Sequence, residues 1–233
     1  ATFAIPPETD LTNPGDLLSD ARYLRGLEFW HLGLYPQANA EMDALRTAVE
    51  ADPAASYRLA NLLVELGAYR PAILAARQVL TLAGMDDAAT LNAPVYFNHI
   101  RFGTYYSELL ISLAQEYDFN PLLVWSLMRQ ESLFERGIRS SVGARGLLQI
   151  MPSTGEEIYR RLGWPPNFTP ADLDRPVISI RMGLDYLNTQ RSYLDGDLYA
   201  AMAAYNGGPG NAAAWLKLAG DNDPDLFLEI IRF

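Results

Sequence analysis

Apolar residues recur at helical spacing along most of the chain, and the alternation typical of strands is weak. In the second half one apolar stripe consists of Tyr106, Leu109, Leu110, Leu113 and Tyr117. Capping residues and prolines mark three further helices there: one opened by Asn120-Pro121 from Leu122 to about Phe134, one opened by Asp174-Arg175-Pro176 to about Leu194, and one capped by Asp197 that ends at Asn206. The pattern predicts an all-α fold.

One motif of the first half occurs twice, 34 residues apart, which is the tetratricopeptide period. It reads Leu32-Gly33-x-Tyr35-x-x-Ala38 and then Leu66-Gly67-x-Tyr69-x-x-Ala72. In such a repeat the small residue lies where two antiparallel helices touch, and each hairpin buries its apolar stripe by stacking on the next. Pro53 and Pro71 fall near helix starts, where a missing N–H costs nothing. Helical hairpins are therefore predicted over about residues 20–82.

The segment 84–94 contains Gly-Met-Asp-Asp and Asn-Ala-Pro and interrupts the helical periodicity. We therefore expect two domains. A tetratricopeptide-like, superhelical arm occupies residues 1–95, and a compact bundle of short helices occupies residues 103–233.

Composition excludes several classes of site. The chain has no cysteine, which rules out disulfides, thiolate zinc sites and cysteine nucleophiles. Its formal charge of −10 argues against a nucleic-acid partner, because phosphate binding needs clustered Lys and Arg. With only His31 and His99 as imidazole ligands, we expect no metal and no other cofactor. No apolar run reaches the roughly 18 residues of a transmembrane segment.

One acid stands in an apolar stripe. Val124, Leu127, Met128 and Glu131 are spaced i, i+3, i+4 and i+7 on the helix opened at Pro121. A carboxylate on the buried face, near the negative end of a helix, favours its neutral form, so we expect Glu131 to be protonated near neutral pH. The alternative is an ordinary ion pair with a nearby arginine: Arg129, Arg136 or Arg139.

Three segments in this order resemble the soluble lytic transglycosylase family: Gln130-Glu131-Ser132, then Gly146-Leu147-Leu148-Gln149-Ile150-Met151-Pro152, then Ala204-Tyr205-Asn206-Gly207-Gly208-Pro209-Gly210. The interval of 15 residues from Glu131 to Gly146 matches that family. The resemblance covers roughly residue 105 to the end, and the repeats in front are similar to the superhelical arm of some members. Three positions depart from the pattern: Glu135-Arg136 stands where Asn-Pro is common, and Leu148 where Met is commoner.

The resemblance implies a lysozyme-like catalytic domain that cleaves peptidoglycan between N-acetylmuramic acid and N-acetylglucosamine. Glu131 would protonate the leaving oxygen and then take a proton from the C6 hydroxyl, which closes a 1,6-anhydro ring. Ser132, Gln149, Tyr205 and Asn206 are candidates to orient the carboxyl group, the acetamido group and the sugar hydroxyls, and Met151 is a further candidate contact. Each also has an ordinary structural role open to it, such as core packing for Tyr205 or helix capping for Asn206.

A glycosidase ordinarily uses two carboxylates. We find no second acid in an apolar stripe, because the remaining candidates lie at caps, turns or an exposed helix: Asp172, Asp174, Asp197, Glu156 and Glu157. Two alternatives stay open. One is a hydrolytic lysozyme-like muramidase, and the other is an inert glycan-binding or scaffold protein.

Peptidoglycan lies outside the cytoplasmic membrane, so this function implies a periplasmic or other envelope location. Residues 1–14 show no basic segment followed by an apolar core, and no signal peptide is expected in them. The repeat arm is a candidate site for a protein partner.

Overall fold

The computed structural model describes residues 10–85, 88–220 and 223–231. In these residues the regular structure is helical, and pairing of extended segments is confined to two isolated bridges, Arg139 with Arg145 and Arg145 with Ile150. The predicted all-α fold is confirmed. None of the helices in the described ranges is both long and apolar enough to cross a membrane.

The chain forms two compact units. The first comprises Ala1–Tyr106 and Trp125–Ile138, and the second comprises Ser107–Val124 and Arg139–Phe233. Helix α7, Pro121–Ser132, contributes residues to both units. The division into domains 1–95 and 103–233 stays a prediction.

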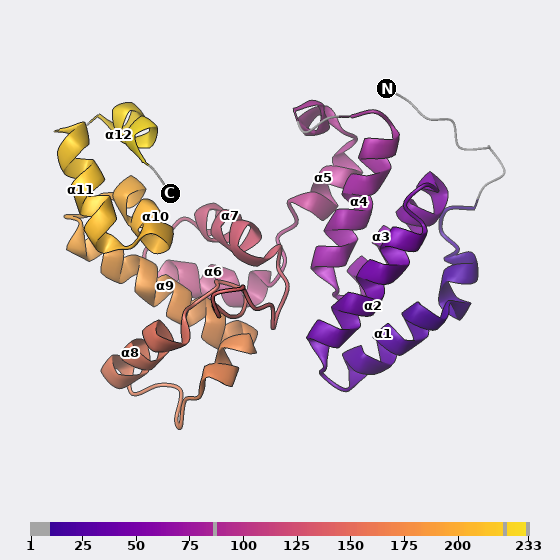
Figure 1. Cartoon of the computed structure of the whole chain (residues 1–233), viewed down its shortest axis with the longest axis horizontal. Helices are drawn as coiled ribbons and strands as arrows, with labels where there is room; N and C mark the ends of the chain where they lie inside the picture. The colour runs from indigo at the N-terminus through magenta and orange to yellow at the C-terminus, as the bar shows by residue number, and fades with distance from the viewer. Residues whose placement is uncertain (1–9, 86–87, 221–222, 232–233) are drawn as a thin grey trace. The chain divides into compact units, whose positions relative to one another are not determined.

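The first unit is built from two helical hairpins (Figure 1). Helix α1 packs against α2, and α3 packs against α4, which also contacts α2 and α5. The elements of this unit before α7 are η1 Gly15–Ser19, α1 Ala21–His31, α2 Tyr35–Ala48, α3 Pro53–Leu66, α4 Tyr69–Leu82, η2 Ala89–Asn92 and α5 Val95–Arg101.

The repeated motif explains both hairpin turns. Gly33 and Gly67 take φ values of 74° and 85°, a left-handed conformation that glycine adopts without steric cost, and each follows the end of a helix. The alanine that follows five residues later is fully buried in both copies. Tyr35 and Tyr69 are the first residues of α2 and α4. The packing of α1 on α2 and of α3 on α4 therefore confirms the predicted hairpins.

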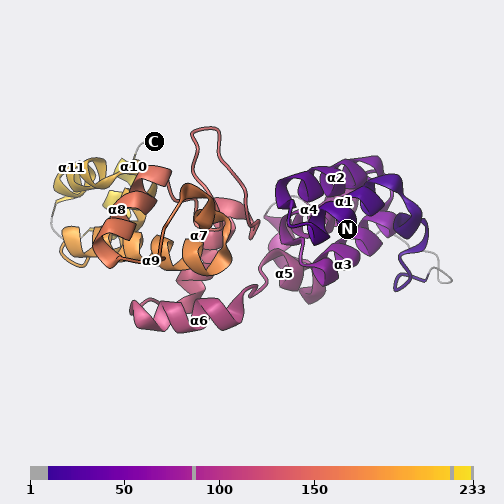
Figure 2. The ribbon, with the colours of Figure 1, turned by 90° about the horizontal axis from the view of Figure 1, so that it is seen from below.

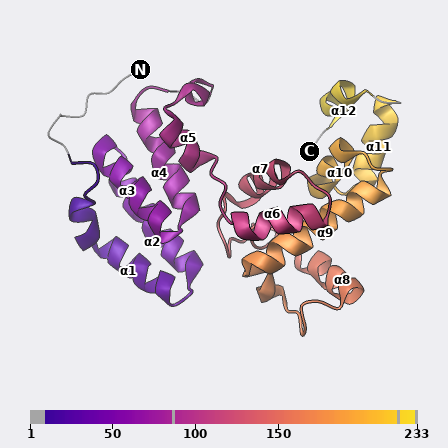
Figure 3. The ribbon, with the colours of Figure 1, turned by 180° about the vertical axis from the view of Figure 1, so that it is seen from behind.

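Helix α9 lies at the centre of the second unit, where it contacts α6, α8, α10 and η3 (Figures 2 and 3). Beyond α10, helix α11 packs on α10 and α12 packs on α11. The elements are α6 Ser107–Glu116, the start of α7, α8 Pro152–Leu162, η3 Pro170–Asp174, α9 Pro176–Tyr193, α10 Leu198–Gly207, α11 Pro209–Ala219 and α12 Pro224–Ile230.

Capping side chains set the helix starts as predicted. Asn120 Oδ1 accepts a 2.9 Å hydrogen bond from the Leu122 amide, and Asp197 Oδ1 accepts one of 2.9 Å from the Ala200 amide. Helix α7 ends at Ser132, about two residues earlier than expected, because Leu133 and Phe134 adopt φ values of 49° and 63° that a right-handed helix excludes.

Candidate active site

Helix α7 carries Glu131 on the face that the apolar spacing predicted. Val124, Leu127 and Met128 are buried, and Glu131 is half-buried one turn after Met128. Ser132 is buried as well, and its hydroxyl donates a 3.0 Å hydrogen bond to the Met128 oxygen of its own helix. The Ser132 hydroxyl is thereby tied to the backbone of the turn that presents Glu131.

Two side chains of α7 attach the helix to the chain around α5. Arg129 Nε donates a 2.8 Å hydrogen bond to the Arg101 oxygen, and the Arg129 guanidinium lies 4.5 Å from the centre of the Phe102 ring. Trp125 Nε1 donates a 2.9 Å hydrogen bond to the Tyr105 oxygen. The first unit therefore holds the half of α7 that bears the acid.

The loop that carries Gln149 is fixed inside the second unit. Arg145 and Ile150 exchange two main-chain hydrogen bonds of 3.0 and 3.1 Å. The Leu148 amide donates a 3.1 Å hydrogen bond to Ser179 Oγ on α9. Gln149 takes a left-handed φ of 46°, and its Nε2 donates a 2.8 Å hydrogen bond to the Gly146 oxygen. The backbone of this loop is therefore closely constrained at the candidate amide.

Glycine is needed at two points, one where this loop meets η3 and one where it meets α9. A Cβ on Gly146 would lie 2.0 Å from the Leu173 oxygen, and Gly146 also has a φ of 76°. A Cβ on Gly183 would lie 2.3 Å from Leu148 Cδ1. At Gly143, by contrast, a Cβ would meet nothing within 4 Å.

Tyr205 joins the loop to α10. Its hydroxyl donates a 2.7 Å hydrogen bond to the Leu148 oxygen, and its ring lies edge-on to Tyr186 with centroids 5.2 Å apart. Asn206 follows as an exposed residue in the last turn of α10, whose C-cap is Gly208. Met151, 38% exposed, is the N-cap residue of α8. The second unit thus brings Gln149 and Tyr205 together through Leu148.

Two buried acids, Asp185 and Glu135, were not identified from the sequence. The expectation that no second acid lies in an apolar stripe is wrong at Asp185. Asp185 on α9 is 4% exposed and forms an ion pair with Arg161, which raises the pKa of that arginine. Its spacing from Ile178 and Met182, i, i+4 and i+7, resembles the spacing that singled out Glu131 and could have found it.

Glu135, 8% exposed, is the second missed acid. Burial raises its pKa above the ordinary value, against the opposing effects of Arg70 and Asn39. No periodic pattern marks it, because it follows the end of α7.

The aspartates that the sequence assigned to caps or turns occupy such positions in the structure. Asp172 forms a capping box with Thr169, and Asp174 accepts hydrogen bonds from Arg145. Asp197 caps α10. In the described ranges no three His, Asp or Glu side chains gather as a metal site requires.

Comparison with known proteins places this geometry in a family. Residues 108–228, which are 121 of the 233 residues, match the model described as "Transglycosylase SLT domain". The chain belongs to this family. The matched stretch contains Glu131, Gln149 and Tyr205, and thus all three segments on which the resemblance rests.

Curated relatives agree over the same part of the chain. The soluble lytic murein transglycosylase of Salmonella typhimurium is 34% identical over 134 residues, which are 57% of this chain and 21% of that protein. Membrane-bound lytic murein transglycosylase C of Haemophilus influenzae strain PittEE is 31% identical over 145 residues, 58% of this chain and 40% of the relative. The chain therefore spans about a fifth of the length of the first of these proteins.

Solved structures match nearly the whole chain. An inactive glutamate-to-glutamine mutant of lytic transglycosylase Slt from Pseudomonas aeruginosa superposes with a TM-score of 0.73 at 29% identity, covering 94% of this chain and 33% of that one. The 70-kDa soluble lytic transglycosylase of Escherichia coli gives 0.77 at 24% identity, covering 97% and 34%. The fold is the all-α, lysozyme-like fold of these enzymes, preceded in the sequence by helical hairpins.

Proposed function

We propose that the chain is the catalytic part of a lytic transglycosylase that cleaves the β-1,4 bond between N-acetylmuramic acid and N-acetylglucosamine in peptidoglycan. The observation that carries the proposal is the position of Glu131: a half-buried acid that continues the apolar face of α7, inside the stretch that matches the SLT domain. A structural neighbour that is inactive with one glutamate changed to glutamine supports a reaction that depends on a carboxyl group.

In the proposed reaction protonated Glu131 donates its proton to the glycosidic oxygen, and the C1–O bond to N-acetylglucosamine breaks. The acetamido group of the muramic acid stabilises the positive charge at C1. The Glu131 carboxylate then removes the proton of the C6 hydroxyl, and O6 bonds to C1 to close the 1,6-anhydro ring. Glu131 ends protonated again, and no water is consumed.

A general acid works best when its pKa is close to the ambient pH, and an apolar environment moves a carboxyl group in that direction. Glu131 continues the buried stripe of Val124, Leu127 and Met128 along α7. Gln149, Tyr205 and Asn206 are proposed to orient the substrate, with Met151 as an exposed contact and Ser132 as a support of the helix turn.

The hydrolytic alternative needs a second carboxylate to hold a water molecule. The two buried acids that the structure adds do not supply it, because Asp185 pairs with Arg161 and Glu135 is bound by Asn39 and Arg70. This favours the single-carboxylate reaction. The location that follows is the cell envelope, where peptidoglycan lies. A protein partner of the arm stays a prediction.

The test is Glu131→Gln, assayed on purified sacculi by mass spectrometry of the released muropeptides. We expect the circular dichroism spectrum to be unchanged. The release of anhydro-ended products should fall by at least about a thousandfold, which corresponds to about 4 kcal/mol of transition-state stabilisation. Glu108→Gln, the same change at an exposed site on α6, should retain full activity. Retained activity of Glu131→Gln would refute the proposal, and products heavier by one water would favour the hydrolytic alternative.

A further inference from the structure

The turn that follows α7 has a strained backbone conformation. Leu133 and Phe134 both have positive φ, which residues with a Cβ rarely adopt, and such strain persists where the surroundings determine the conformation. Phe134 is 2% exposed, and its ring lies edge-on to Tyr105 with centroids 5.0 Å apart. Tyr106 donates a 3.4 Å hydrogen bond to the Phe134 oxygen. The turn immediately after Ser132 is thereby held by the first unit.

Glu135, the residue after this turn, is bound by side chains of helices α2 and α4. Asn39 Nδ2 donates a 3.0 Å hydrogen bond to Glu135 Oε1. Arg70 Nε lies 3.3 Å from Oε2, an ion pair that lacks the alignment of a hydrogen bond. Because Asn39 is on α2 and Arg70 on α4, this carboxylate fixes the end of α7 to both hairpins.

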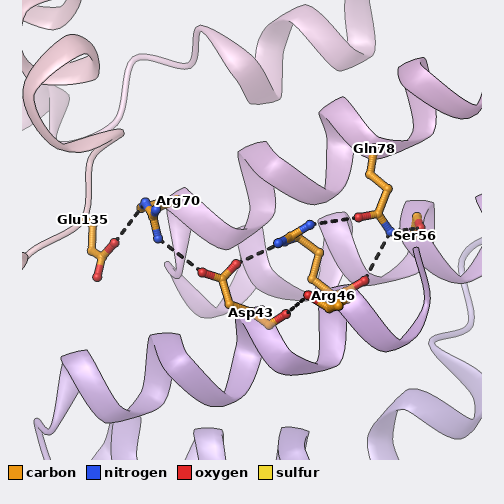
Figure 4. Close-up of polar contacts among 7 residues, drawn as sticks. Asp43, Arg46, Ser56, Arg70, Gln78 and Glu135 are labelled. Atoms are coloured by element: carbon orange, nitrogen blue, oxygen red, sulfur yellow. Dashed lines mark hydrogen bonds and ion pairs between the residues drawn. The ribbon is translucent and has the colours of Figure 1, made fainter. Parts of the chain in front are cut away.

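Glu135 also ends a row of polar contacts across the hairpins (Figure 4). Arg70 Nη1 donates to Asp43 Oδ2 at 3.2 Å, and Asp43 Oδ1 accepts from Arg46 Nε at 3.0 Å. Arg46 in turn donates to Gln78 Oε1 at 3.0 Å. Asp43 therefore holds the guanidinium of Arg70 in place independently of Glu135. Arg70 is for this reason a well-positioned partner for Glu135.

Arg136 provides a second attachment, to α1 and α2. Its guanidinium lies 4.7 Å from the centre of the Tyr35 ring and 5.5 Å from that of Trp30. Nη1 also donates a 3.3 Å hydrogen bond to the Tyr35 hydroxyl. Tyr35 is itself packed edge-on against Trp30, with centroids 5.0 Å apart, so the guanidinium contacts a rigid aromatic pair.

A buried carboxylate contributes little to stability, since the loss of hydration offsets the attraction to its partner. It does fix geometry, because only a narrow set of positions satisfies both Asn39 and Arg70. Glu131 lies in the last turn of α7, and the last turn of a helix is the part that frays unless other contacts hold it. Glu135 and Arg136 supply such contacts one turn downstream of the acid.

We propose that Glu135 and Arg136 are positioning residues for Glu131, which fix the C-terminal end of α7 to α1, α2 and α4 and thereby hold the carboxyl group in its reactive place. This inference rests on the proposed function of Glu131 as the proton donor. It gives the hairpins a part in the reaction, as the support of the acid.

The test measures kcat and KM of the full chain on purified, uncross-linked glycan strands at a temperature well below unfolding. For Glu135→Gln/Arg136→Gln we expect kcat to fall about tenfold or more with KM within about twofold, since a displacement of about 1 Å can cost up to about a hundredfold in rate. Each single variant should show a smaller fall in kcat, and these keep the test decisive if the double variant does not fold. Arg136→Lys, which keeps the charge without the planar group, should restore only part of the rate.

Gln78→Leu is the matched control, since it breaks the far end of the same row of contacts and leaves Glu135 and Arg136 in place. Its kcat should stay within about twofold of the unmodified chain. An unchanged kcat in the Glu135 and Arg136 variants, or an equal fall in Gln78→Leu, would overturn the inference. If Glu131→Gln is inactive while the Glu135 and Arg136 variants have normal kcat, only this inference fails. If Glu131→Gln is active, the proposed function fails.

Discussion

The hydroxyl of Tyr205 donates a 2.7 Å hydrogen bond to the main-chain oxygen of Leu148, 57 residues earlier in the chain. This contact connects the last turn of α10 with the loop that carries Gln149. The Leu148 amide is bound at the same time by Ser179 of α9, so both main-chain polar groups of Leu148 are used in fixing the loop. Two segments recognised separately in the sequence thus form one structure.

Removing that hydroxyl should loosen the loop. For Tyr205→Phe we expect a loss of about 1–2 kcal/mol in the free energy of unfolding, because a buried carbonyl loses a donor. Release of anhydro-muropeptides should fall several-fold. Urea denaturation and the sacculus assay measure the two effects. Tyr193→Phe, the same change at a tyrosine that is 63% exposed, is the control and should alter neither quantity. Full activity and stability in Tyr205→Phe would contradict this role.

Gly146 should tolerate no side chain. In Gly146→Ala the new Cβ would lie 2.0 Å from the Leu173 oxygen, so the loop or η3 has to move, and we expect a loss of about 3 kcal/mol or more or failure to fold. Gly143→Ala separates the effect of space from that of backbone conformation, since it has a φ of 92° but an open environment. It should cost only about 1–2 kcal/mol. Equal thermal stability of the two variants would argue against this close contact.

The ion pair of Asp185 with Arg161 offers a test of the buried acid on α9. Arg161→Met leaves a buried carboxylate without its partner, and we expect a loss of about 2–3 kcal/mol, less than for a fully buried pair because Arg161 is half exposed. The double variant Asp185→Leu/Arg161→Met should recover most of that loss. A double-mutant cycle by chemical denaturation measures the coupling, and additive losses would show that the pair is not coupled.

Glu135 should make stability depend on pH in a particular direction. Its pKa in the folded chain is raised above 4.5, mainly by burial, so the folded state favours the protonated form. The stability associated with that form is fully present below about pH 4.5 and is lost as the pH rises through the folded pKa. Glu135→Gln cannot ionise, so its Tm relative to the unmodified chain should rise between pH 4 and pH 8. A difference that is constant or falls over this range would contradict the assigned shift.

The sequence predicted what local patterns encode. Asn120 and Asp197 marked helix starts, and the apolar spacing placed Glu131 on the inner face of α7. The end of α7 was misplaced because Leu133 and Phe134 turn the chain without the glycine that ordinarily signals such a stop.

The partners of Glu135 and Arg136 could not be predicted at all. Asn39 lies 96 residues before Glu135 and Tyr35 lies 101 residues before Arg136, and contacts at such distances in the sequence leave no periodic signal. In the sequence Glu135 stood out only as a departure from the family pattern, and Arg136 also as one of three arginines near Glu131. Asp185 differs, because its spacing from Ile178 and Met182 on α9 is the kind of local pattern that marks Glu131 on α7.

The grouping of residues 125–138 with the hairpins bears on how the protein can be shortened for laboratory work. A recombinant fragment that begins at residue 103 would keep Glu131 yet lose Trp30, Tyr35, Asn39 and Arg70, the side chains that bind the residues after α7. Its Glu135 would then have neither cation nor amide beside it. The smallest piece that retains the full support of the acid starts before Ala21, so a screen for inhibitors should use that longer piece.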